Sequence, residues 1–237
     1  MNISHLQKLS MKISRKPREL EQLRTTTRMN MYIELKQLSE KHSSGKYTKA
    51  ESGRISMEIE RQLCGDPVAP GAPPLPAGIK QGVTEAIALI KQEDPDVLVA
   101  ASFMRWSKAV GLLMKMKNQE AEPELKAALE YDPHNAFALC SLAYLAGFQG
   151  DAREALALSQ QAIDVNPNLP EAYLEMGNAY ENLGEHTSAM EAWEKARKLS
   201  PEMVKLDDKP ETNGKVISGR ERLNYEVLTD EPDDTTK

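Results

Sequence analysis

Three prolines recur at a fixed interval in the second half of the chain. Pro133, Pro167 and Pro201 lie 34 residues apart. Each proline disfavours the helical conformation in the residue before it, so each marks the end of a helix. A period of this length is typical of a repeated helix-turn-helix unit, in which every unit packs on the next. The spacing therefore predicts an all-α stack of helical hairpins.

Small and large side chains fall at matching offsets within these periods. The last period carries Tyr173, Met176, Gly177, Tyr180, Gly184, Ala189, Trp193 and Ala196. The middle period carries Leu139, Leu142, Ala143, Ala146, Gly150, Ala155, Ser159 and Ala162, with the serine where a large aromatic is usual. The first period supplies Ala121, Leu125 and Ala128, preceded by Trp106 and Ala109 and by no glycine at the turn. We expect Gly177 and Ala189 at close helix contacts, with Tyr180 and Trp193 filling the space between helices.

This pattern resembles the tetratricopeptide repeat over roughly residues 96 to 201. The resemblance implies a right-handed superhelix of about three repeats, capped at its open end by a helix over residues 79–93. The first interval, from Pro95 to Pro133, is 38 residues long, which predicts a helix lengthened by about one turn. Asp151 with Glu154, and Asn168 with Glu171, are typical capping pairs at helix starts.

Charge is distributed unevenly along the chain. Residues 1–50 carry 11 Lys and Arg against 4 Asp and Glu, residues 51–201 carry 13 against 22, and residues 202–237 carry 6 against 10. A basic front end can meet nucleic acid, an anionic membrane, an acidic partner or the acidic body of its own chain. No aromatic-interleaved basic stripe accompanies it, so we expect no nucleic-acid partner and at most a peripheral membrane contact.

The basic front end also has helical periodicity. Leu6, Leu9 and Ile13 precede Pro17, and Leu20 and Leu23 follow it, so Pro17 is the expected start of a second helix. The first eighteen residues contain no acidic side chain, which keeps a mitochondrial transit peptide open as an alternative to a cytoplasmic protein with an amphipathic helix.

Residues 31–63 predict two short helices around a glycine turn. Gly45 would end the first helix, and Thr48 would cap the second together with Glu51. The pair resembles the helical hairpin of SHOCT-type modules, although Ser52 stands where an aromatic is usual, and the resemblance implies association. So small a hairpin must dock on the repeats, on a second copy or on a partner.

The expected domains are basic N-terminal helices with the hairpin (1–64), a Pro/Gly-rich linker (65–78), the repeats (79–201) and an acidic, largely disordered tail (202–237). One apolar segment, Leu223 to Leu228, interrupts the tail. It would either cover the last helix or occupy the binding groove until a partner displaces it.

The resemblance also implies that partners bind a concave groove lined by the first helix of each repeat. The expected partner-binding residues are Trp106, Phe137, Ser141, Tyr144, Phe148, Glu171, Leu174, Glu175, Asn178 and Asn182. Phe103, Ser107, Val110 and Cys140 occupy further groove positions. An aromatic and acidic groove suits a protein segment, a peptide or helix with apolar anchors and a basic flank. Ser141, Glu171 and Glu175 replace the basic and amide side chains of a chaperone-binding carboxylate clamp, so an acidic C-terminus would be repelled.

Catalytic and metal chemistry have little support in the sequence. His5, His42, His134 and His186 are dispersed, and no phosphate-cradling glycine loop is present. Cys64 and Cys140 have no pairable spacing and no neighbouring histidines, so we expect no disulfide, zinc or other cofactor.

We therefore expect a non-enzymatic scaffold or adaptor that associates through its N-terminal hairpin. The alternative is an assembly or secretion chaperone: the order of hairpin, linker and repeats is similar to cytochrome c assembly factors, and secretion systems use repeat chaperones of this kind.

Overall fold

The computed structural model describes residues 17–42, 46–93 and 95–201, and all regular structure within these ranges is helical. Nine helices follow one another in this part of the chain. They are α2 (Pro17–His42), α3 (Lys49–Cys64), α4 (Ala77–Glu93), α5 (Pro95–Leu113), α6 (Asn118–Tyr131), α7 (Ala136–Gln149), α8 (Ala152–Val165), α9 (Pro170–Asn182) and α10 (His186–Leu199). The expectations for Leu6, Leu9, Ile13, Gly45 and the tail from Leu223 to Leu228 lie outside the described residues.

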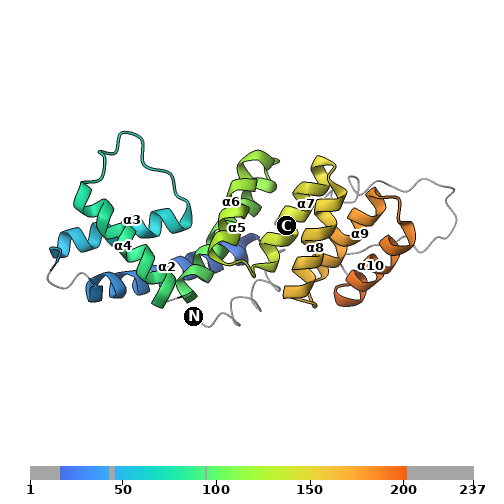
Figure 1. The fold of residues 1–237 in the computed structure, drawn as a ribbon, viewed down its shortest axis with the longest axis horizontal. Coiled ribbons are helices and arrows are strands. Elements are labelled where there is room, and N and C mark those ends of the chain that lie inside the picture. Colours follow the sequence, from blue (N-terminus) through green and yellow to red (C-terminus); the bar gives the residue numbers. More distant parts are fainter. Residues whose placement is uncertain (1–16, 43–45, 94, 202–237) are drawn as a thin grey trace, which may run out of the picture.

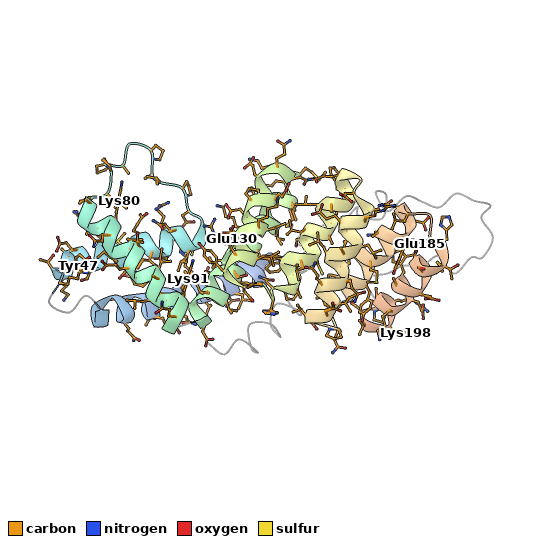
Figure 2. The ribbon with its side chains drawn as sticks, viewed as in Figure 1. Tyr47, Lys80, Lys91, Glu130, Glu185 and Lys198 are labelled. Atoms are coloured by element: carbon orange, nitrogen blue, oxygen red, sulfur yellow. The ribbon has the colours of Figure 1, made fainter. Side chains whose placement is uncertain are left out.

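Three helical hairpins, α5–α6, α7–α8 and α9–α10, stand side by side along the right-hand two-thirds of the molecule in Figure 1. The expected all-α stack of tetratricopeptide type is confirmed. Helix α5 has 19 residues, whereas α7 has 14 and α9 has 13, so the first hairpin does contain a helix longer by about one turn. Figure 2 places Glu185 and Lys198 at opposite ends of α10, whose basic last turn complements the helix dipole.

Small residues allow the two helices of each hairpin to approach closely. A Cβ atom on Gly177 of α9 would overlap the indole ring of Trp193 on α10, and Ala189 is fully buried. Ser159 is also fully buried, and its hydroxyl donates to the carbonyl oxygen of Ala155 at 2.8 Å. Ser159 stands where the repeat usually has a large aromatic residue, and it can be buried there because its hydroxyl has a hydrogen-bond partner within its own helix.

Each helical hairpin turns through one residue in the left-handed conformation. Gly150 (φ 93°) and Gly184 (φ 78°) have this role after α7 and α9, as does Met116 (φ 57°) after α5. In all three turns the next residue donates its N–H to a carbonyl five residues earlier, as from Lys117 to Leu112 at 3.0 Å. This is the Schellman ending of a helix, which favours glycine. Met116 therefore adopts the backbone conformation at a cost that the two glycines avoid.

The N-terminal hairpin of α2 and α3 packs on the first hairpin of the stack. Met31 and Leu35 of α2 and Ile55 and Ile59 of α3 belong to one buried cluster, which continues into α5 through Val97 and its neighbours. Helix α2 starts at Pro17 as expected but runs for 26 residues instead of forming a short helix. Of the three docking places that the sequence left open, the structure has the hairpin on the repeats. Helix α4 packs on α3 and α5, so α2, α3 and α4 together cover that end of the stack.

Two of the three capping pairs predicted from the sequence are confirmed. Thr48 and Glu51 form a complete capping box at α3, and Asp151 accepts from the N–H of Glu154 at α8. The expectation for Asn168 is wrong, because α9 starts at Pro170 with Leu169 as its cap residue. Proline is favoured at the first helical position because its φ is already helical and its missing N–H needs no partner. Asn168 instead donates its backbone N–H to the side chain of Asn166.

Candidate partner-binding face

The first helices of the three hairpins, α5, α7 and α9, form one continuous surface, which we call the α5–α7–α9 face. Helix α7 packs on both α5 and α9. The expected partner-binding residues lie on these helices, and their burial separates them into a core group and an accessible group.

Trp106 belongs to the core. Its side chain is 3% exposed and lies between the rings of Phe103 and Phe137, with ring centroids 5.6 and 5.1 Å away. Its indole N–H donates to the Ser141 hydroxyl at 3.2 Å, and that hydroxyl donates to the carbonyl oxygen of Phe137 at 2.9 Å. The structure therefore places Trp106 inside the molecule, where it fixes Ser141 and Phe137 instead of meeting solvent. The indole can be buried because it packs between two aromatic rings and its N–H has a hydrogen-bond partner.

The accessible aromatic surface lies on α7. Phe148 is 43% exposed and Tyr144 is half-buried, with their ring centroids 6.4 Å apart. Two aromatic rings one helical turn apart offer apolar surface, and because aromatic side chains have few rotatable bonds, little conformational entropy is lost when a ligand covers them. These two residues are the apolar part of the face.

An acidic side chain from α9 lies close to this aromatic pair. The pKa of Glu175 is raised to about 7: burial raises it most, a hydrogen bond from Asn178 lowers it, and the charge of Glu171 raises it. Burial raises the pKa of Tyr144, and the negative charge of Glu175 raises it by a smaller amount. The effect of Glu175 on Tyr144 means that these two side chains are near each other across α7 and α9, whereas the sequence placed the aromatic and acidic parts of the face at opposite ends.

Asn178 links the acid to the core of the last hairpin. Its amide nitrogen donates to Glu175 Oε2 at 3.3 Å, and its carbonyl oxygen accepts from the Trp193 indole N–H at 3.3 Å. Because Trp193 is locked against Gly177, this chain of hydrogen bonds fixes the Glu175 carboxylate. Sequence reasoning named Asn178 as a partner contact but missed its role in positioning, since a tryptophan fifteen residues later gives no local signal.

The remaining expected residues range from buried to exposed. Leu174 is half-buried and packs on the cluster of Ala189 and Trp193, and Asn182 is exposed at the end of α9. Glu171 is half-buried in the first turn of α9. Ser107 and Cys140 are buried, so their side chains do not reach the surface of the face.

A second polar cluster, which the sequence did not predict, joins the N-terminal hairpin to the repeats. Arg105 of α5 donates to the carbonyl oxygens of Leu63, at 2.9 Å, and Gln62, at the end of α3. Lys108 donates to the carbonyl oxygen of Gly65, and Glu124 of α6 pairs with both cations at 2.7 and 2.6 Å. Cations at a helix C-terminus satisfy its open carbonyls and its dipole. The cluster holds α3 on α5. Arg105 and Lys108 are both bound within this cluster, and not on the α5–α7–α9 face.

In the described ranges no group of three or more His, Cys, Asp or Glu side chains is arranged to hold a metal ion. None of the helices from α2 to α10 combines the length and apolarity that crossing a bilayer requires.

Two sequence models of the tetratricopeptide repeat match the chain, one over residues 149–184 and the other over residues 170–203. Their matches coincide with α8, α9 and α10. The chain therefore contains tetratricopeptide repeats, and residues 149–203 belong to that family. No curated protein matches the sequence at a significant level.

Among solved structures, the MamA protein aligns with 76% of this chain and 99% of its own, at 16% identity and a TM-score of 0.38. YrrB, described as a TPR protein with an unusual peptide-binding site, aligns with 84% of this chain and 94% of its own, at 14% identity and a TM-score of 0.39. Scores of this size describe a partial overlap of helices, so the family assignment rests on the sequence models.

Proposed function

We propose that the protein is a non-enzymatic scaffold or adaptor that binds a segment of a partner protein on its α5–α7–α9 face. The segment would carry an apolar side chain for Tyr144 and Phe148 and a Lys or Arg for Glu175. The observation that carries the proposal is the placement of this carboxylate near the half-buried Tyr144, whose ring adjoins the exposed ring of Phe148. A ligand with both an apolar side chain and a Lys or Arg would bind such a surface more tightly than a ligand with neither.

The aromatic part and the acidic part of the face would contribute to the free energy of binding in different ways. Covering the rings of Tyr144 and Phe148 removes apolar surface from water, which is worth about 1 to 3 kcal/mol for one well-buried anchor. A cation beside Glu175 would favour its ionised form and add a charge-assisted hydrogen bond, worth about 1.5 to 3 kcal/mol. Asn178 holds the carboxylate in place before binding, so little ordering cost remains at that point.

The test is a peptide-display selection on the full chain, followed by affinity measurements on the selected peptides. We expect the selected peptides to combine an aromatic or branched apolar residue with Lys or Arg. Phe148→Ala and Glu175→Lys should each weaken binding by tenfold or more.

Two control variants make matched changes outside the face. Met190→Ala removes an exposed apolar side chain of α10, and Glu191→Lys reverses an exposed charge on the same helix. Both should leave the affinities unchanged. Peptides that bind all four variants equally well would show that the face is not the binding site.

A further inference from the structure

We propose that residues 1–16 of this chain fold back as an intramolecular ligand of the α5–α7–α9 face, so that a partner must displace them. The inference rests on the proposed function of that face. The segment lies outside the described residues, and its sequence has both features that the face selects. It contains Lys8, Lys12, Arg15 and Lys16 without one Asp or Glu, and Leu6, Leu9 and Ile13 recur at helical spacing.

The charge of residues 1–16 is complementary to that of the α5–α7–α9 face. Glu171 and Glu175 are the acids of the face, and Glu175 makes no ion pair with any described residue. Arg105 and Lys108, the cations of α5, are both bound to Glu124 and to carbonyl oxygens of the N-terminal hairpin. The face is therefore acidic, and a segment with four cations and no acid is attracted to it.

Residues 1–16 are joined to α2, and the start of α2 is held near α5. Arg28, in the first half of α2, binds Asp66 at 2.6 Å, and the neighbouring Gly65 is held by Lys108 of α5. Leu23 is buried in the cluster that α2 shares with α5. Figure 1 shows the start of α2 beside α5, with the helix running away from the stack. The described chain therefore begins, at Pro17, at the α5 end of the face.

Residues 1–16 are long enough to reach Glu175 from the start of α2. Neighbouring packed helices lie about 10 Å apart, so Glu175 on α9 is about 20 Å from α5. Sixteen residues span about 24 Å as a helix and about 50 Å when extended. The segment can therefore reach the acid from its own attachment point, and the tether raises its effective concentration there.

The acidic tail is the competing occupant within this chain. Residues 202–237 carry 6 Lys and Arg against 10 Asp and Glu, so Glu171 and Glu175 would repel them. The apolar segment from Leu223 to Leu228 has anchors, but the charges of Arg220 and Arg222 beside it are outnumbered by the acids Glu221, Glu226, Asp230 and Glu231.

The experiment uses the full chain with Lys8→Glu, Lys12→Glu and Arg15→Glu, which should empty the face. A fluorescent peptide of residues 1–18 is titrated with this charge-reversed chain and with the wild type, and its anisotropy is measured. We expect the charge-reversed chain to bind the peptide at least tenfold more tightly than the wild type, whose own segment competes. Circular dichroism checks that the helices are unchanged.

Glu175→Lys in the charge-reversed chain should weaken binding of the peptide at least tenfold, and Glu175→Gln should weaken it less. Glu191→Lys should have no effect, and a peptide of residues 219–231 should not bind. Absence of saturable binding of the 1–18 peptide, binding indifferent to Glu175→Lys, or binding of the tail peptide instead would each overturn the inference.

Sedimentation separates the intramolecular arrangement from exchange between copies. A wild-type chain that assembles with rising concentration, while the charge-reversed chain stays monomeric, would overturn folding back within one chain. Display-selected peptides that still bind the charge-reversed chain through Glu175 would leave the proposed function intact even if the 1–18 peptide fails.

Discussion

Glu175 should make the stability of the folded protein depend on pH in a window that ends near neutrality. Its carboxyl has an ordinary pKa of 4.5 and a pKa of about 7 in the folded protein. Between these values the folded state holds a proton that the unfolded chain has released. The free energy of unfolding therefore falls as the pH rises through this window, and the loss is complete above about pH 7.

The size of the effect follows from the difference between the two pKa values. A change of one in pKa is worth about 1.36 kcal/mol, so the difference of about 2.5 sets an upper limit of about 3.4 kcal/mol. The Glu175 side chain is partly exposed to solvent, which reduces the expected effect to about 1 to 2 kcal/mol.

Glu175→Gln removes the titrating group but keeps an oxygen that can accept from Asn178. We expect this variant to be more stable than the wild type by about 1 to 2 kcal/mol at pH 8 and nearly equal to it at pH 4.5. Urea unfolding followed by circular dichroism at several pH values measures the difference, and Glu191→Gln is the exposed control. Parallel pH profiles for the wild type and Glu175→Gln would refute the reasoning, because the folded and unfolded carboxyls would then titrate alike.

Three further changes test the packing. Gly177→Ala should lower the free energy of unfolding by about 1 to 2 kcal/mol, because the new Cβ atom overlaps the Trp193 ring. Gly111→Ala in α5 has open space around it and should raise the free energy of unfolding by about 0.5 to 1 kcal/mol. Thermal unfolding compares the two variants. Met116→Gly should stabilise by about 1 kcal/mol in the same assay by relieving the left-handed backbone, and a loss of stability would contradict the assigned turn. Arg105→Met should cost about 1.5 to 3 kcal/mol and speed amide hydrogen exchange in α3, since two carbonyls and Glu124 lose a partner; unchanged exchange there would contradict the role of the cluster.

Local and periodic signals predicted much of the fold. The 34-residue proline spacing gave three helical hairpins, and the 38-residue interval gave the longer α5, because both patterns follow directly from helix geometry. Pro17 and the pair of Thr48 and Glu51 marked helix starts correctly, since capping depends on residues within one turn.

Features that depend on distant partners were not predictable from the sequence. The role of Arg105 requires carbonyl oxygens more than 40 residues earlier, at the end of another helix. Trp106 was expected on the surface because its repeat position allowed it, and the packing of α5 on α7 decided that it is buried. The closeness of Glu175 to Tyr144 likewise depends on how α9 packs on α7.

The most direct test of the central claim is amide chemical-shift mapping by nuclear magnetic resonance of the isotope-labelled full chain, with a display-selected peptide added. The account predicts that the signals of Tyr144, Phe148 and Glu175 shift in proportion to peptide occupancy, while those of the exposed residues of α8 and α10 stay in place. Shifts confined to α8 and α10, with Tyr144 and Glu175 unmoved, would contradict partner binding on the α5–α7–α9 face.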